Sequence, residues 1–213
     1  MALMADRTDR SETSRLIELA VRGDQRALGE LLGRHRERLR CMVALRLDRR
    51  LQGRVDPSDI IQEAYLDAAR RLPDYHQNPT MSFFLWLRFL TGQRLVDEHR
   101  RHLGAAGRDA GREVSLYRGA LPETSSAALA AQLLGRLTTP SQAAIRAERQ
   151  IRLQDALNSL DPIDREVLVL RHFEELSNGE AAAVLGLDKS AASKRYARAL
   201  IRLKDILASL SGA

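Results

Sequence analysis

The feature that most constrains this fold is a stretch of 37 residues, Gly104 to Pro140, that contains five glycines and two prolines. Its middle is rich in serine, threonine and alanine, and little helical periodicity exists outside residues 127–134. Glycine leaves the backbone free and proline removes a hydrogen-bond donor, so this composition favours a flexible connection. We therefore expect a linker that divides the chain into two separately folded halves.

Both halves are predicted to be helical. Only 4% of the residues are aromatic, 29% are charged, and alternating runs of β-branched residues are nearly absent. Apolar residues instead recur at three- and four-residue steps, which places them on one face of a helix. Asp56-Pro57 and Asp161-Pro162 each supply a capping carboxylate and a proline at the first helical position. The predicted fold class is all-α, with two helical domains.

Several helix boundaries of the first half can be predicted. An apolar stripe indicates one long helix over about residues 28–51. Pro73 is expected to stop the next helix, which leaves residues 74–80 as an irregular loop. A helix over residues 83–102 follows, and its first half is apolar on every side.

The charge of the chain indicates an anionic partner. There are 34 Lys and Arg against 28 Asp and Glu, a formal charge of +6 and a pI of about 10.1, so nucleic acid is the first candidate. The single cysteine, Cys41, excludes an intramolecular disulfide and a CxxC metal site, which fits a reducing compartment. The apolar runs are too short for a membrane span, and residues 1–11 lack a secretory signal. We expect a cytoplasmic protein without membrane insertion.

Motifs for catalysis are missing from the sequence. The five histidines show no HExxH spacing, there is no GxxxxGK[ST] or GxGxxG loop, and no serine lies in a nucleophile elbow. We predict that the protein is not an enzyme and uses neither a metal nor a cofactor.

The clearest binding motif lies near the C-terminus. Ser177 and Glu180 have the spacing of a capping box for a short helix, and Gly186 suits a left-handed turn into a second helix. Residues 188–204 hold six Lys and Arg against one Asp, and small side chains near the start of the second helix would let it approach DNA bases. The pattern favours a DNA-reading helix-turn-helix. The alternative is a solvated amphipathic helix that closes a bundle.

A second candidate site for nucleic acid lies in the first half. Five of the nine aromatic residues fall within residues 75–89, before a basic helix end. Unpaired bases stack on such rings, and the loop over residues 75–78 is the segment with the best chance of touching them. The alternative is that most of these rings are core, which is the interpretation we prefer for Phe84 and Phe89.

An acidic strip is predicted on the helix that starts after Asp56. Asp59, Gln62, Glu63 and Asp67 share one face at helical spacing. DNA phosphates would repel this face, so a protein partner is one interpretation and an ordinary exposed helix face is the other. The pattern alone does not separate them.

Three of these motifs together resemble a known family. They are Asp-Pro-Ser-Asp-Ile-Ile-Gln-Glu-Ala-Tyr (56–65), the Phe/Trp helix that ends in Asp-Glu-His-Arg-Arg (97–101), and Leu-Gly-Leu-Asp-Lys-Ser (185–190) in the helix-turn-helix. In order and spacing the chain resembles bacterial RNA polymerase sigma factors of the extracytoplasmic-function (ECF) group, which is group 4 of the sigma-70 family. The resemblance implies a sigma factor that binds RNA polymerase core and directs promoter recognition, DNA melting and initiation. The alternative is a stand-alone helix-turn-helix regulator.

The resemblance also implies the domain organisation and the partners. A disordered N-terminus (1–13) precedes sigma domain 2 (14–103), the linker (104–140) and sigma domain 4 (141–213). The implied partners are promoter DNA and the core polymerase, through the clamp helices of its β′ subunit and its β flap. Regulation would come from another protein, an anti-sigma factor, or from the level of synthesis.

The implied site residues form three sets. The set for core polymerase is Asp59, Gln62 and Glu63. The set for the minus-10 element is Tyr75, His76, Asn78, Phe83, Trp86, Arg94, Arg100 and Arg101. The set for the minus-35 element is Lys189, Ser190, Ala191, Lys194, Arg195 and Arg198.

The chain departs from the family pattern at the start of the recognition helix. Many relatives have Pro-x-Gly-Thr-Val there, whereas this chain has Asp-Lys-Ser-Ala-Ala at 188–192, so no minus-35 sequence preference can be carried over. Gly92 lies inside a predicted helix, where it costs about 1 kcal/mol relative to alanine, and no feature of the sequence explains it.

Overall fold

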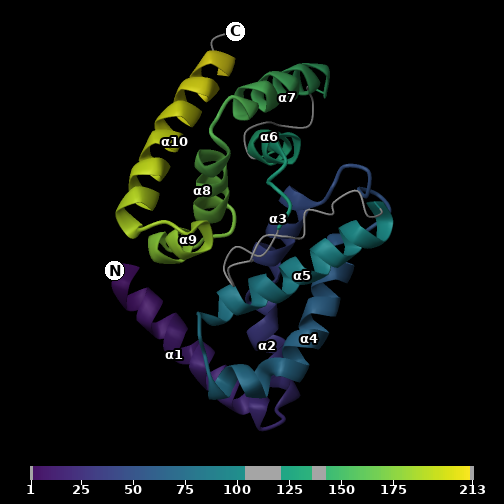
Figure 1. The fold of residues 1–213 in the computed structure, drawn as a ribbon, viewed down its shortest axis with the longest axis vertical. Helices are drawn as coiled ribbons and strands as arrows, with labels where there is room; N and C mark the ends of the chain where they lie inside the picture. The colour runs from purple at the N-terminus through teal and green to yellow at the C-terminus, as the bar shows by residue number, and fades with distance from the viewer. Residues whose placement is uncertain (1, 104–120, 136–142, 212–213) are drawn as a thin grey trace.

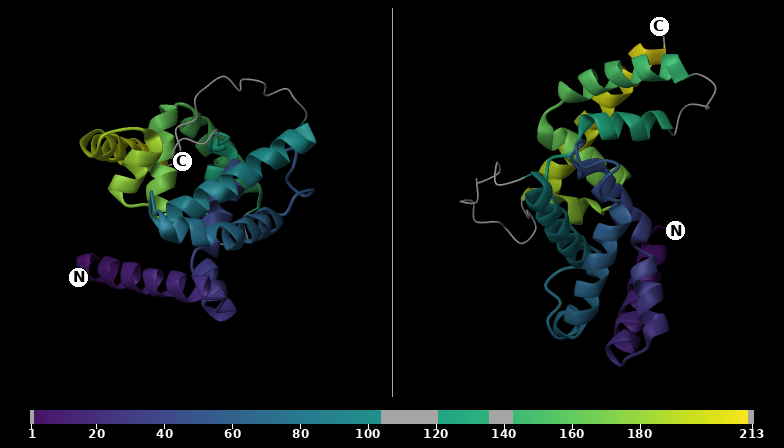
Figure 2. Two further views of the ribbon diagram at one scale, coloured as in Figure 1. Left: turned by 60° about the horizontal axis from the view of Figure 1, so that its bottom comes forward. Right: turned by 90° about the vertical axis from the view of Figure 1, so that its right-hand side faces the viewer.

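The computed structural model describes residues 2–103, 121–135 and 143–211. Within these ranges the regular elements are helices, and they form two units that lie one above the other in Figure 1 and in the right-hand view of Figure 2. The all-α prediction is therefore confirmed. No helix in the described ranges is long and apolar enough to cross a membrane.

The N-terminal unit contains five helices: α1 (Ala2–Val21), α2 (Gln25–Gly33), α3 (Arg36–Arg46), α4 (Pro57–Gln77) and α5 (Phe83–Leu103). α4 packs along α5, and α1 packs along α2. The core between them is built from fully buried leucines and isoleucines of several helices, including Leu31, Leu39, Ile60 and Leu87. Because α1 begins at Ala2, the N-terminal segment expected to be disordered is helical from there on.

The long helix expected over residues 28–51 is wrong, because the chain bends at His35. The His35 N–H donates to the Leu32 carbonyl, which tightens the last turn of α2, and α3 starts one residue later. The His35 ring is buried against Phe83 and Phe84, with ring centroids 5.6 and 5.4 Å away. This ring packing holds the bend, and the segment after α3 is irregular.

Pro73 does not stop α4, which continues to Gln77. Pro73 lies on the exposed side of the helix, where water can satisfy the carbonyl that loses its intrahelical donor. The expected loop over 74–80 is therefore shorter, and Tyr75 and His76 belong to the last helical turn.

The C-terminal unit contains α6 (Ser126–Gly135), α7 (Ala143–Asn158), α8 (Pro162–His172), α9 (Asn178–Leu185) and α10 (Lys189–Ser211). The Asp161 carboxylate accepts the Ile163 N–H, so Asp161 caps α8 as its Asp-Pro sequence predicts. α8 is buried through Val167, Leu168 and Val169 and packs against α9 and α10.

The described part of the stretch predicted as a linker, residues 121–135, lies against both units. α6 coincides with the helical periodicity expected over residues 127–134, packs along α7 and contacts α3. Just before α6, the Ser125 N–H donates to the Leu45 carbonyl at 2.9 Å. Leu121 lies over α5, where a Cβ on Gly92 would be 2.5 Å from its Cδ2 atom. The close approach of Leu121 accounts for glycine at position 92.

Candidate nucleic-acid interface

α9 is started by a complete capping box. The Ser177 hydroxyl accepts the Glu180 N–H at 3.2 Å, and the Glu180 carboxylate accepts the Ser177 N–H at 3.0 Å. Two backbone donors that would otherwise lack helical partners are satisfied in this way. The capping box that the sequence predicts is therefore confirmed.

A glycine in the left-handed backbone conformation connects α9 to α10. Gly186 has φ 63 and ψ 37, a conformation that carries little steric cost without a Cβ. The Leu187 N–H donates to the Ala182 carbonyl, and the Asp188 carboxylate accepts the Ala191 N–H at 2.7 Å. The turn fixes the direction of α10, while buried Ala192 keeps the two helices close.

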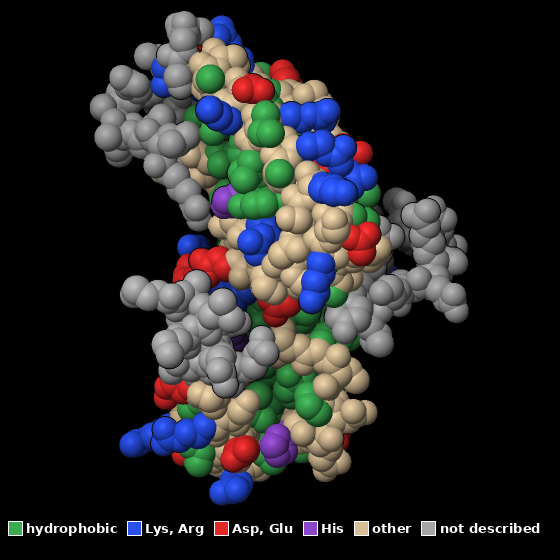
Figure 3. Space-filling model, turned by 90° about the vertical axis from the view of Figure 1, so that its left-hand side faces the viewer, with side chains coloured by type: hydrophobic (Ala, Val, Ile, Leu, Met, Phe, Trp, Pro, Cys, Tyr) green, Lys and Arg blue, Asp and Glu red, His purple; other side chains and the backbone are tan. Residues whose placement is uncertain are grey.

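The outer side of α10 is basic and open to solvent. Lys189, Ser190, Lys194 and Arg198 are exposed, and Ala191 is half-buried. Figure 3 shows Lys and Arg side chains gathered on the upper part of this side of the molecule, where α10 lies. The described helix can therefore present cations and short side chains together to a duplex groove.

Arg195 differs from its basic neighbours on α10. Its guanidinium donates to Asp164 at 2.8 Å and to Asp161 at 3.4 Å. The hydrogen bond to Asp164 raises the pKa of Arg195, and Asp164 itself is buried. Arg195 thus joins α10 to the start of α8, a role that sequence reasoning missed.

The predicted minus-10 rings form a closed cluster at the junction of α4 and α5. Tyr75 stacks on Trp86 with centroids 4.6 Å apart and meets Phe83 edge-on at 5.7 Å. The Tyr75 hydroxyl donates to the Met81 carbonyl at 2.9 Å, and burial raises the pKa of Tyr75 to about 12. Phe83 is 4% exposed and Trp86 is half-buried. The rings are already stacked on one another, and the exposed members of the minus-10 set are His76, Asn78, Arg100 and Arg101.

The basic members of the minus-10 set are not equally available. Arg94 hydrogen-bonds to Asp67 of α4, with Glu63 also 3.9 Å away. Arg101 pairs with Glu98 one turn earlier, and Arg100 is exposed. Two of the three arginines are therefore engaged within the N-terminal unit.

The acidic strip on α4 is shorter than the sequence pattern suggested. Asp59 and Gln62 are exposed and Glu63 is half-buried, but Asp67 is buried in its pair with Arg94. The same surface carries Leu66, which is 59% exposed. Sequence reasoning missed this apolar side chain, which stands one helical turn from Gln62 and Glu63.

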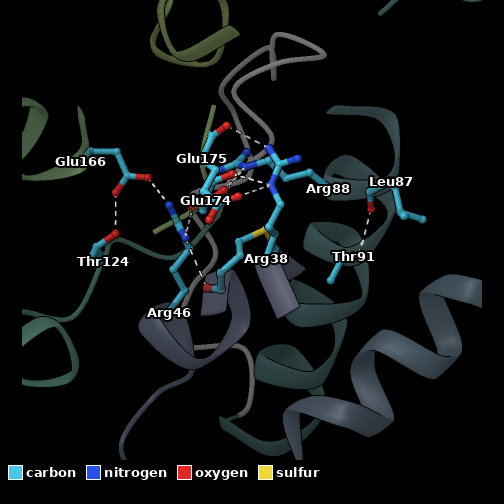
Figure 4. A network of polar contacts seen from close by, with 10 residues as sticks. Arg38, Arg46, Leu87, Arg88, Thr91, Thr124, Glu166, Glu174 and Glu175 are labelled. Atoms are coloured by element: carbon cyan, nitrogen blue, oxygen red, sulfur yellow. Dashed lines mark hydrogen bonds and ion pairs between the residues drawn. The ribbon is translucent and has the colours of Figure 1, made fainter. Parts of the chain in front are cut away.

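Sequence reasoning also missed a buried charge cluster between the two units, drawn in Figure 4. Glu174, between α8 and α9, is fully buried, and its carboxylate accepts from Arg88 Nε of α5 at 2.5 Å and lies 2.6 Å from Arg46 Nη1 of α3. Arg46 also pairs with Glu166 of α8. Burial alone would raise the pKa of Glu174, but the Arg46 and Arg88 charges lower it below its usual range.

Backbone contacts extend this cluster. Arg38 of α3 donates to the carbonyls of Glu174 and Glu175 at 2.8 and 3.2 Å, and its guanidinium lies 3.5 Å from the centre of the Phe84 ring. Ser82, just before α5, donates to the Glu180 carboxylate at 2.6 Å. Because the partners are far apart in the sequence, no local pattern could have indicated them.

Comparisons with known proteins fit both halves of the chain. The family described as Sigma-70, region 4 matches residues 150–203, which include the helix-turn-helix. The ECF RNA polymerase sigma factor SigD of Mycobacterium tuberculosis is 34% identical over 191 residues, or 87% of this chain and 79% of SigD. The RNA polymerase sigma factor CnrH of Cupriavidus metallidurans is 30% identical over 190 residues, or 88% of this chain and 90% of CnrH.

A solved structure is similar over nearly the whole fold. It is that of CnrH in complex with the cytosolic domain of CnrY, with a TM-score of 0.54 and 26% identity. The similarity covers 93% of this chain and 98% of the CnrH chain. It therefore includes both helical units.

Proposed function

The chain belongs to the ECF group of RNA polymerase sigma factors, and on this premise we propose how its surfaces divide the work of promoter recognition. Residues 14–103 serve as sigma domain 2 and residues 141–213 as sigma domain 4, and residues 104–140 connect them through a segment whose helix α6 packs on α7. A stand-alone helix-turn-helix regulator is not favoured, because SigD and CnrH are similar to this chain over both halves.

The observation that carries this proposal is the exposed basic side of α10, mounted on a fully capped helix-turn-helix. Lys189, Lys194 and Arg198 would pair with phosphates and guanine edges of the minus-35 element, while Ser190 and Ala191 allow close approach. Arg195 would join them only after leaving Asp164, so we assign it first to the internal pair.

The α4–α5 junction is proposed to recognise the minus-10 element. His76 and Asn78 are exposed and would contact base edges, while Arg100 would hold the backbone. Tyr75, Phe83 and Trp86 would receive an unstacked base after their mutual stacking opens. Arg94 and Arg101 would reinforce the phosphate contacts by leaving their acidic partners.

The exposed face of α4 is proposed to bind the core polymerase. Asp59, Gln62 and Glu63 offer polar contacts to the β′ clamp helices, and exposed Leu66 adds apolar area beside them. The C-terminal unit would contact the β flap. This activity belongs to the cytoplasm, and the complex of CnrH with CnrY supports a protein regulator, an anti-sigma factor, for this chain as well.

A binding assay with purified core polymerase and no DNA tests this assignment. Gln62→Ala combined with Glu63→Ala should weaken core binding and reduce promoter-dependent transcription. The control, Glu37→Ala with Gln52→Ala, removes the same side-chain types from other exposed positions of the N-terminal unit and should bind like the parent. Equal core affinity of the two double variants would contradict the α4 assignment, and no core binding by the parent would contradict the proposed function.

A further inference from the structure

The described arrangement connects the two proposed DNA-reading elements through α9. Ser82, just before α5, donates to Glu180 in the first turn of α9. In the same turn, Asn178 donates to the backbone carbonyl of Lys189, the first residue of α10. One helical turn therefore bridges the minus-10 and minus-35 surfaces.

Promoter binding requires a different arrangement. The minus-10 and minus-35 elements are about 25 base pairs apart, roughly two and a half turns or 85 Å of B-form DNA. Two elements bridged through α9 cannot reach both positions on one duplex. The units must separate before both elements are read.

The ion pairs that hold the two units together join cations of the N-terminal unit to anions of the C-terminal unit. The N-terminal unit supplies Arg46 and Arg88, whose side chains are 1% and 4% exposed, and the C-terminal unit supplies Glu166 and Glu174. Among the contacts that the structure describes, Arg88 pairs with Glu174 alone. Two buried cations are thus balanced by two anions from across the interface, and losing one partner would leave a buried charge uncompensated.

The backbone at the contact includes one residue in a left-handed conformation. Glu175 has φ 53, a left-handed conformation that non-glycine residues rarely adopt. This bend accompanies the two carbonyl contacts with Arg38. Hydrogen bonds inside the C-terminal unit, such as that from the Leu176 N–H to the Leu170 carbonyl, close the same turn, so the bend belongs to this unit and presents the two carbonyls to Arg38.

We propose that this arrangement is an autoinhibited state of the chain, in which Glu174 acts as a latch on an arginine-lined surface formed by Arg38, Arg46 and Arg88 of the N-terminal unit. The inference rests on the proposed function only in taking promoter binding as the process that is blocked. Separation exposes the three arginines to solvent together with the start of α5. The surface fits an acidic, carboxylate-bearing segment, and in this state the occupant is the Glu174–Glu175 turn of the same chain.

Distance measurement between the units tests the latch directly. Fluorophores are placed at Arg71→Cys on α4 and Asn158→Cys on α7, both exposed positions, in a Cys41→Ser background. The labelled parent should show mainly a short distance. Glu174→Gln keeps the side-chain shape but removes the charge, and it should move most molecules to longer and broader distances.

The matched control is Glu175→Gln. The Glu175 side chain is exposed, and its main contact to Arg38 is made by the backbone carbonyl, so this variant should keep the short distance. Arg88→Gln cuts the same pair from the other unit and should open the chain like Glu174→Gln. Circular dichroism checks that each variant keeps its helices, and Arg88→Gln decides the test if Glu174→Gln does not fold.

The measured distances in the variants distinguish a latch from an incidental contact. An unchanged short distance in a folded Glu174→Gln or Arg88→Gln variant would overturn the latch, as would equal opening by the Glu175→Gln control. The distance measurement uses neither polymerase nor DNA, so it fails independently of the proposed function. With core polymerase added, Glu174→Gln should form open complexes several-fold faster than the parent, and a rate equal to or below that of the parent would contradict autoinhibition.

Discussion

The exposed side of α10 and the aromatic end of α5 are both proposed to face promoter DNA, but their side chains are in different conditions. On α10 the Lys189, Lys194 and Arg198 side chains are exposed on a rigid capped motif. At the α4–α5 junction Tyr75 and Trp86 are stacked on each other. The exposed basic side of α10 can bind in a duplex groove without any rearrangement of the protein. An unstacked base needs a pocket that is exposed only after ring contacts break, so minus-10 recognition should depend on a rearrangement that minus-35 recognition does not need.

The largest expected effect is on stability at the aromatic end. Phe83→Ala should lower the free energy of unfolding by about 3–5 kcal/mol, because it removes a buried ring from contacts with His35, Tyr75 and Trp86. His76→Ala, at an exposed neighbouring position, should change it by less than about 0.5 kcal/mol. Denaturant unfolding measures both, and similar values for the two variants would show that the cluster is not a packed core.

The next effect is on duplex binding by α10. Lys194→Ala combined with Arg198→Ala should reduce affinity for a short duplex at low salt by about tenfold or more, and lower the salt slope by about 2 if both contact phosphates. Unfolding should be almost unchanged because both side chains are exposed.

The control for this prediction is Arg26→Ala with Arg36→Ala, two exposed arginines of the N-terminal unit. It removes the same charge from a surface that is not assigned to DNA. Fluorescence anisotropy at several salt concentrations distinguishes the pairs. If both double variants lose the same affinity, the binding reflects total charge and not the α10 surface.

A smaller effect is expected where the segment before α6 approaches α5. Alanine at an ordinary helical glycine stabilises the helix by about 1 kcal/mol, but at Gly92 its Cβ would crowd Leu121. Gly92→Ala should therefore bring little or no gain in the free energy of unfolding. In a Leu121→Ala background the gain should appear, and the same gain in both backgrounds would mean that Leu121 does not pack on α5.

The smallest effect is a pH dependence confined to the N-terminal unit. Burial lowers the pKa of His99 below 6.5, against the opposing charge of Asp48 and together with Arg50, and the His99 Nε2 atom accepts the Asp48 N–H. The folded state therefore binds the proton less readily than the unfolded state, so stability should fall as the pH drops below about 6.5. An NMR titration of the His99 ring checks this, and a pKa above 6.5 would contradict it.

The two regions also differ in how far their sequences predict them. The helix-turn-helix follows from local signals, because the Ser177–Glu180 capping box and Gly186 act within a few residues. The α4–α5 junction was predicted less well, since Pro73 is tolerated on the exposed side of α4 and this puts Tyr75 on a helix. The bend at His35 depends on rings near the start of α5, which no window around His35 contains.

No local pattern in the sequence predicts the contact between the two units. Arg88 and Glu174 are 86 positions apart, and each looks like an ordinary charged residue in its own helix or turn. Gly92 is an anomaly inside a predicted helix, and the residue that explains it is the distant Leu121. Pairings set by tertiary packing leave only such isolated anomalies in the sequence.

The most direct test of the difference between the two DNA-facing regions uses Trp86, the single tryptophan of the chain. A short duplex of random sequence and a pool of random single strands are each titrated into the free protein, while DNA anisotropy and Trp86 emission are followed together. We predict salt-sensitive duplex binding with unchanged Trp86 emission, and no change in emission with single strands, because Trp86 remains stacked on Tyr75. Strong quenching of Trp86 by single strands at the concentrations where the duplex binds would show a pocket that is already open, and would contradict the account.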